Sequence, residues 1–399
     1  MTGAAGQRLL ASAAALAFPR RAGSEGSRRV VDLLAARLDE LGYAVWKEDF
    51  SYDLRPVERI LRRVLGGGAC LVAAAGPLTV RSPVWSMLLA AAVLMVGGLV
   101  LGWSPWLERF YRRSGPTRTA NVVGRRRGAD PRRRLILMAH HDSKSQSLAL
   151  PARMSATLGA LLGVLGVAVA AGIEIGGRWI PPFWLGPVVG FLGGLSLLAL
   201  ATMTTGNASP GGVDNAGSLA IVLELAARIR TIPSDLELVV LFTGAEEDHM
   251  VGAMRWLDRH ADEFPVGSTQ CLNFDGAGSP GREVLITRFG LGRPFAPGLE
   301  RIALECAREM QLPVRRIVMA PAVGIDAIPF AHRGIECLSF SSGSLGRATA
   351  AVHSAGDRAE NLDGATMESI VDHAQAVVER LMGASFSSII DDPIQPREA

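Results

Sequence analysis

Residues 135–143 read Leu135-Ile136-Leu137-Met138-Ala139-His140-His141-Asp142-Ser143, a short apolar run that passes directly into histidine and aspartate. An uninterrupted apolar run of this length is typical of a strand buried on both faces of a sheet. In open α/β sheets the ligand site lies beyond the carboxyl ends of the strands, where His140 and Asp142 fall. The stretch therefore predicts a buried strand with functional residues at its end.

Other apolar runs along the chain are followed by polar residues in the same way. Leu236–Phe242 leads into Thr243-Gly244-Ala245-Glu246-Glu247, and Leu272–Phe274 leads into Asp275. Further strands are expected at Val45–Phe50 and Cys337–Phe340, and helical spacing recurs at 30–41, Ser218–Ile229, Gly298–Met310 and Met367–Leu381. Strands that alternate with helices predict an α/β fold whose mainly parallel or mixed sheet is flanked by helices.

The overall composition is too apolar for an ordinary soluble enzyme of 399 residues, with 49% hydrophobic residues and a mean hydropathy of +0.25. The excess lies in four uncharged segments, Val64–Val80, Val84–Leu107, Met154–Ile173 and Trp179–Met203. Since a helix needs roughly 20 apolar residues to cross a bilayer, these segments predict about four transmembrane helices in two hairpins. The first is short and contains Gly66-Gly67-Gly68 and Pro77, so we expect it to be tilted, broken or re-entrant. Buried helices of a larger soluble domain are the alternative.

The predicted hairpins interrupt the α/β domain twice. We expect residues 1–54, 118–145 and 211–388 to form that domain, 55–117 and 146–210 to form the hairpins with their flanks, and 389–399 to form a polar tail. Most arginines near the hairpins lie on the domain side, at Arg55, Arg59, Arg62, Arg63, Arg109, Arg112, Arg113, Arg118 and Arg153. The opposite turns contain only Arg81 and Arg178. The positive-inside rule therefore predicts an integral membrane protein with a cytoplasmic α/β domain.

The expected strands and loops end in residues of types that bind metal ions: His140, His141 and Asp142; Asp214; Glu246 and Glu247; Asp275; and His353 and Asp357. Histidines and carboxylates together suit a pair of divalent ions, for which zinc is the default. Taken singly each signal is weak, because a strand-end aspartate is usually a cap and a Glu-Glu pair is usually a solvated face. Their joint occurrence makes the prediction. The four cysteines show no CxxC spacing, so a thiolate zinc site is not expected, and a net charge of +3 argues against a nucleic-acid partner.

In this order the motifs His-x-Asp, Asp-Asn, Glu-Glu, Asp and His-x-x-x-Asp resemble the M28 family of co-catalytic zinc aminopeptidases. Asn121-Val122-Val123-Gly124 and the stretch from Asp326 to Ile335 are similar to further segments of that family, and the resemblance covers about 260 residues. Two departures, Ala216-Gly217-Ser218 after Asp214-Asn215 and His249–Ala253 after the glutamates, remove no ligand. They leave the substrate preference open.

The resemblance implies a role for each ligand residue. Asp214 would bridge two zinc ions, Glu247 and His353 would complete one of them, and His140 and Asp275 the other. It also implies that Glu246 is the general base for a metal-bridged water.

Three further roles concern neighbouring residues. Asp142 would orient His140, as a carboxylate partner fixes an imidazole tautomer, and Asp357 would do the same for His353. His141 and His249 either touch this centre or pack in loops.

The sequence thus predicts a membrane-embedded zinc-dependent peptidase, an aminopeptidase by the resemblance. The alternatives are a carboxypeptidase, dipeptidase or other amide hydrolase on the same fold, or an inactive membrane scaffold, which would bind no zinc. Only Ser143–Arg153 and Thr204–Val213 separate the second hairpin from the motifs. At about 3.3–3.6 Å per residue these tethers keep the centre near the bilayer, so a membrane-associated peptide is an expected substrate. The oligomeric state is not indicated.

Overall fold

A computed structural model describes residues 3–101, 109–177, 182–290, 292–319, 323–343 and 347–383. Parts of the second and fourth predicted spans (102–107 and 179–181), Arg178 and the predicted polar tail lie outside the described residues. The chain divides into two compact units. The sheet unit comprises Met1–Tyr52, Ser114–Ser145 and Gly206–Ala399, and the helical unit comprises Asp53–Arg113 and Gln146–Thr205.

The sheet unit is built on a sheet that has nine strands within the described residues, in the order β1-β2-β6-β3-β7-β11-β8-β10 with β9 beside β8. The strands are β1 (Ala44–Tyr52), β2 (Thr117–Arg127), β3 (Arg133–His140), β6 (Leu236–Thr243), β7 (Thr269–Phe274), β8 (Glu283–Phe289), β9 (Arg293–Pro294), β10 (Arg315–Val318) and β11 (Glu336–Ser342). The pairs β3–β6, β3–β7, β7–β11 and β8–β10 are parallel and the others antiparallel. The predicted mixed α/β sheet is confirmed.

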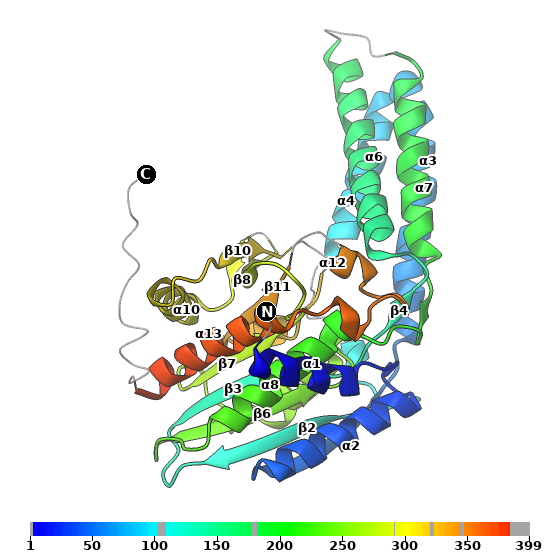
Figure 1. Ribbon diagram of the computed structural model, residues 1–399. Coiled ribbons are helices and arrows are strands. Elements are labelled where there is room, and N and C mark those ends of the chain that lie inside the picture. The colour runs from blue at the N-terminus through cyan, green and yellow to red at the C-terminus, as the bar shows by residue number, and fades with distance from the viewer. Residues whose placement is uncertain are drawn as a thin grey trace. The chain divides into compact units, whose positions relative to one another are not determined.

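The neighbouring strands β6 and β3 lie in the interior of the sheet and are buried along most of their length. All eight residues of β6 and the last six of β3 are buried. Strands covered on both faces have continuous apolar sequences, which is the pattern of Leu238–Phe242 and Leu135–Met138. Figure 1 shows α8 crossing this part of the sheet, and α8 contacts β3, β6 and β7.

The helices of the sheet unit form two packed groups. One contains α1 (Ala4–Leu16), α8 (Gly217–Arg228), α10 (Pro297–Glu309) and α13 (Gly364–Gly383), in which α1 and α8 contact α13 and each other. The other contains α9 (Val251–Arg259) and α11 (Ala327–His332). The remaining elements are α2 (Glu25–Glu40), α12 (Arg347–Ala351), the short helices η1 (Gly212–Ala216) and η2 (Ala359–Asn361), and the small strands β4 (Ser145–Gln146) and β5 (Thr205–Gly206).

The helical unit consists, in its described residues, of α3 (Arg55–Arg81), α4 (Pro83–Leu101), α6 (Leu150–Gly176) and α7 (Leu185–Ala201). Only α3 and α6 are long and apolar enough to cross a membrane by length and composition; α4 and α7 are shorter apolar helices. The expectation of a broken or re-entrant first segment was wrong, because α3 continues through Gly66-Gly67-Gly68 and Pro77. Likewise α6 runs to Gly176, beyond its predicted end at Ile173.

Glycines bring the helices of this unit together. A Cβ atom built on Gly163 of α6 would lie 2.3 Å from Cα of Gly193 on α7, and one built on Gly190 would lie 2.8 Å from Cα of Gly76 on α3. Large apolar side chains point outward instead, including Trp85, Leu99, Leu162, Val169 and Phe191, each more than half exposed. The helices of the unit therefore meet at glycines and at buried apolar residues such as Val72 and Val167, and large apolar side chains also face outward.

Candidate metal centre

Three adjacent strands deliver four of the predicted residues to one edge of the sheet. His140 is the last residue of β3, Glu246 and Glu247 follow β6, and Asp275 follows β7. Because β3 lies between β6 and β7 and is parallel to both, the carboxyl ends of the three strands meet at the same edge.

Asp214 enters the same place from η1, the short segment that precedes α8. The Asp357 carboxylate holds this segment by accepting hydrogen bonds from the backbone N–H groups of Val213 (2.7 Å) and Asp214 (3.2 Å). The Asn215 side chain donates to the Phe274 carbonyl oxygen (3.1 Å), which fixes η1 against the end of β7. Asp357, which was expected to orient His353, supports the backbone of Val213 and Asp214.

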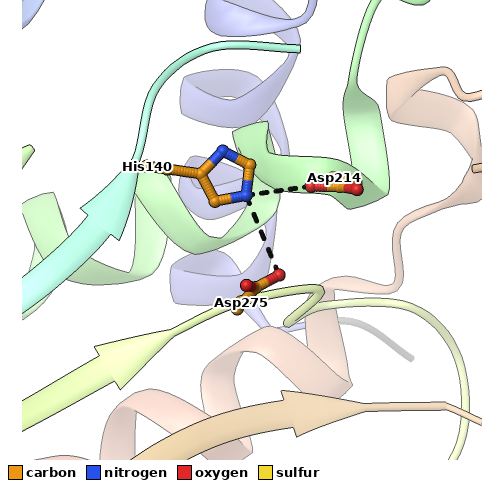
Figure 2. Close-up of side chains that lie close together, drawn as sticks. All are labelled: His140, Asp214 and Asp275. Atoms are coloured by element: carbon orange, nitrogen blue, oxygen red, sulfur yellow. Dashed lines mark ion pairs between the residues drawn. The ribbon is translucent and has the colours of Figure 1, made fainter. Parts of the chain in front are cut away.

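The five predicted ligand residues lie together in two groups that share Asp214. In the group we call site 1, His140 Nε2 lies 3.0 Å from Asp214 Oδ1 and 3.8 Å from Asp275 Oδ1 (Figure 2). In site 2, His353 Nε2 lies 3.2 Å from Asp214 Oδ2 and 3.0 Å from Glu247 Oε2. The two oxygens of one carboxylate therefore face two different histidines.

This donor set fits a pair of zinc ions. His140 Nδ1 donates to the Asp142 carbonyl oxygen (3.1 Å), so a neutral His140 ring turns the lone pair of Nε2 toward Asp214 Oδ1. Among the described residues no hydrogen-bond donor satisfies Asp214 Oδ1 or Glu247 Oε1, although both oxygens are buried. Buried acceptors that face one another need a cation between them. Donor atoms 3.0–3.8 Å apart are suited to share one zinc ion with bonds of about 2.0–2.2 Å.

The electrostatics of the centre also favour positive charge. Burial opposes ionisation of Asp214 and Glu247, but nearby cationic side chains outweigh it. His140 and His353 hold the pKa of Asp214 well below its usual range, and His353 with Lys144 lowers the pKa of Glu247 to about 2. Burial likewise opposes protonation of His140, yet Glu246 and hydrogen bonds to the aspartates raise its pKa well above the usual value. The folded chain thus assembles buried anions that gain from a cation.

Glu246 belongs to neither group of ligands. Its Oε2 lies 3.9 Å from His140 Nε2, and the residue is only 8% exposed. Burial raises the pKa of Glu246 well above the usual range; His140 opposes the shift, and the charges of Asp275 and Glu247 add to it. A carboxylate of this kind, buried beside the ligands but outside both sets, is suited to proton transfer.

Asp142 acts on the glutamate loop more directly than on His140. Its carboxylate accepts hydrogen bonds from the N–H groups of Glu246 (3.0 Å) and Glu247 (3.2 Å), whereas its Oδ1 lies 3.7 Å from His140 Nδ1. The imidazole is instead oriented by the Asp142 carbonyl oxygen. His141, which was expected either to touch the centre or to pack in a loop, donates a hydrogen bond from Nε2 to the Ala120 carbonyl oxygen (2.8 Å) on β2. His249 lies in the loop after the glutamates, where burial and Lys144 lower its pKa to about 4.

Three polar residues near the centre were not predicted as site residues from the sequence. Lys144 forms an ion pair with Glu247 (3.0 Å) and is one of only two lysines in the chain, a signal that could have been noticed. Asp326 is buried, accepts a hydrogen bond from the Thr243 hydroxyl and has its pKa raised by burial to about 7. Arg20 is buried and donates to the carbonyl oxygens of His141 and Gly211.

Comparison with known proteins agrees with this geometry. Residues 198–378 match the model of Peptidase family M28. None of the curated proteins compared with the chain matches it in sequence. Solved structures do match: a zinc aminopeptidase from Bacillus subtilis has 13% identity and a TM-score of 0.58, with 98% of this chain and 99% of that chain covered.

Two further solved structures have a similar fold. An aminopeptidase from Aneurinibacillus sp. strain AM-1 has 12% identity and a TM-score of 0.58, with 98% of this chain and 96% of that chain covered. The glutaminyl cyclase of Fimbriiglobus ruber has 14% identity and a TM-score of 0.53, with 95% and 96% covered. At these identities the likeness establishes the fold.

Proposed function

We propose that this metallopeptidase, which matches the model of Peptidase family M28 over residues 198–378, is a zinc-dependent aminopeptidase with two zinc ions. His140, Asp214 and Asp275 would hold one ion, and Asp214, Glu247 and His353 the other. The observation that carries the proposal is the position of Asp214, whose Oδ1 and Oδ2 lie 3.0 Å and 3.2 Å from the Nε2 atoms of two histidines. A carboxylate placed in this way is suited to bridge two cations.

The chain's own residues supply proton transfer and positioning. Two zinc ions, when bound, lower the pKa of water and polarise a peptide carbonyl. Glu246 takes the proton of the attacking water and passes it to the leaving amine, because its carboxylate lies beside the ligands and belongs to neither metal-binding group. Asp142 holds Glu246 and Glu247 through their N–H groups, so the base and a ligand keep a fixed relation to each other.

Hydrolysis of a peptide panel by the full chain in detergent tests this activity. Peptides with free N-termini should be cleaved from that end and lose cleavage when the N-terminus is acetylated. A chelator should abolish the activity and added zinc should restore it. Equal cleavage of acetylated peptides, or activity that a chelator leaves intact, would contradict the proposal.

A second candidate activity is another reaction of amides on the same fold, since a glutaminyl cyclase shares this fold. The metal ligands alone do not determine which end of a substrate is held. The same panel separates the candidates when it includes peptides with an N-terminal glutamine and peptides with an amidated C-terminus. Ammonia release from the former would favour a cyclase, and resistance of the latter would favour a carboxypeptidase.

We further propose that the helical unit is embedded in a bilayer with four spans, and that the sheet unit is cytoplasmic. The outward-facing apolar side chains and the glycine contacts between helices support embedding, because membrane helices associate through small residues. Thr79 and Ser86 donate their hydroxyl hydrogens to backbone carbonyls of α3, so neither hydroxyl requires water.

The arginines on the sheet-unit side of the hairpins support the orientation. Protease added to sealed inside-out vesicles should digest the sheet unit; its protection would reverse the orientation.

The substrate we propose is a peptide adsorbed to or released from the membrane, because short tethers join the second hairpin to the metal motifs. In liposomes that contain the protein, a lipid-anchored peptide should be cleaved faster than the same soluble peptide. A detergent-solubilised sample with both peptides is the control, since it removes the advantage of a shared surface. Equal rates in liposomes would argue against this substrate class.

A further inference from the structure

The two metal-binding groups differ in one charged neighbour. At site 2 the Lys144 ammonium lies 3.0 Å from Glu247 Oε2, and the Lys144 side chain is only 16% exposed. Within the described residues no lysine or arginine forms an ion pair with the other carboxylates of the two sites, Asp214 and Asp275. Site 2 therefore contains a fixed cation of the chain itself, and site 1 does not.

Lys144 is held in this position by the backbone. Its ammonium also donates to the Glu247 carbonyl oxygen (2.7 Å), while the Glu247 N–H donates to Asp142 Oδ2 (3.2 Å). The peptide groups on both sides of Glu247 are therefore tied to residues of the segment that follows β3. Because of these bonds, the ammonium remains beside Glu247 even when its contact with Oε2 is lost.

From this geometry we propose that Lys144 is a competing cation that lowers the zinc affinity of site 2. A zinc ion at site 2 would share the Glu247 carboxylate with the ammonium, whether it binds Oε2 or the unsatisfied Oε1, and would therefore lie close to a positive charge. Charges in a mostly buried centre are weakly screened, so the repulsion is strong there. The proposal rests on the proposed two-zinc centre and assigns Lys144 as the residue that sets the affinity of one position.

Lysine composition provides the matched control. Only two of the 41 lysines and arginines in the chain are lysines, Lys47 and Lys144. Lys47 pairs with Asp32 on the surface and is 45% exposed. Lys47→Met therefore lowers the net charge of the chain by one, as Lys144→Met does, but it changes no residue of the centre.

The experiment measures zinc affinity and stoichiometry rather than turnover. The full chain in detergent is stripped of metal and titrated with zinc in competition with a chelating dye. The wild type should bind two ions, and Lys144→Met should raise the affinity of the weaker position by about 10- to 100-fold, the scale on which groups around a ligand act. Lys144→Arg, which keeps the charge, and Lys47→Met should leave both affinities near the wild-type values.

Ligand variants assign the positions. His353→Ala should remove the ion whose affinity responds to Lys144, and His140→Ala should remove the other. If Lys144→Met does not give a folded protein by thermal melting, Lys144→Gln is titrated instead, because it loses the charge but keeps a donor for the Glu247 carbonyl. An unchanged or lowered affinity of site 2 in these variants would overturn the role of Lys144. Absence of zinc binding in the wild type would instead overturn the proposed two-zinc centre.

Discussion

At the scale of single residues, the centre depends on backbone groups as much as on side chains. The Asp142 carboxylate accepts two consecutive N–H groups of the glutamate loop, and the Asp357 carboxylate does the same for Val213 and Asp214. Both aspartates therefore position metal-ligand residues through the peptide chain. A carboxylate that accepts two backbone hydrogen bonds fixes a loop more tightly than a single side-chain contact does.

Replacing Glu246 should separate catalysis from metal binding. Glu246→Gln removes the proton acceptor but keeps the size of the side chain, so we expect kcat to fall by about 10²- to 10⁴-fold with zinc content unchanged. Asp214→Ala should lose both activity and zinc, because it removes a ligand common to both sites. Metal analysis and peptide hydrolysis on the same preparations check this pair. Wild-type turnover by Glu246→Gln would show that another group is the base.

His260 gives the sheet unit a pH-dependent contribution to stability, away from the metal centre. Its Nε2 and Nδ1 each lie 2.7 Å from a carboxylate, of Glu48 on β1 and of Glu263 after α9, and Arg125 and Arg259 also contact these glutamates. Burial opposes protonation of His260, but the two glutamates outweigh it and raise its pKa.

The sign of this effect follows from linkage. A pKa raised in the folded state stabilises the protein fully below the unfolded value of about 6.5, and the contribution is lost as the pH rises through the folded pKa. We expect the denaturation midpoint of the wild type to decrease as the pH rises from the unfolded to the folded pKa of His260 and to level off above it, and that of His260→Gln to vary less. Parallel curves for the two proteins from pH 5 to pH 9 would contradict this expectation.

At the scale of elements, the packing of α3, α6 and α7 depends on glycine. The Cβ positions of Gly76, Gly163, Gly190 and Gly193 are occupied by backbone atoms of the neighbouring helix. Helices can approach closely only where no side chain intervenes, so these positions determine which faces meet.

Substitution of one of these glycines should destabilise the helical unit. Gly163→Leu must push α7 away from α6, and overpacking of this kind costs about 1–3 kcal/mol. Gly97→Leu is the matched control, because a Cβ atom on Gly97 of α4 meets no atom within 4 Å. Thermal or denaturant unfolding in detergent measures the difference. Equal stability of the two variants would mean that the close helix contact is not required.

At the scale of the whole molecule, the metal centre joins segments that are far apart in sequence. Its proposed ligands come from residues 140 to 353, and the second hairpin is inserted between His140 and Asp214. Metal ions that bind only the folded chain stabilise it by mass action, by about 2.7 kcal/mol for each ion at a hundredfold excess over its dissociation constant. Loss of zinc should therefore weaken the fold as a whole.

Zinc removal should lower the melting temperature of the sheet unit. We expect a chelator to shift its unfolding downward and added zinc to reverse the shift. Asp214→Ala should melt at the same temperature with and without zinc, since it lacks the shared ligand. Scanning calorimetry in detergent provides the measurement. A wild-type melting temperature that is insensitive to zinc would indicate that no ion binds the native centre.

Much of the fold could be predicted from the sequence, because strands that are buried on both faces have uninterrupted apolar sequences. The continuous apolar runs Leu135–Ala139 of β3 and Leu238–Phe242 of β6 predicted strands, and the polar residues after them predicted the edge where the candidate centre lies. The sequence patterns did not predict β8, β10 or α9. For β10 the reason is visible, since Arg315–Val318 is an edge strand with exposed arginines and no apolar run.

The sequence by itself determined the residue types at the strand ends, the apolar segments and the resemblance that assigns the ligands. Only the tertiary structure decided which groups face one another: that Asp142 binds the glutamate loop, that Asp357 supports Asp214, and that Lys144 lies against Glu247. The physical reason is that strand and helix patterns reflect burial of each segment along the chain, whereas contacts between loops depend on the order of strands in the sheet. Periodicity does not encode that order.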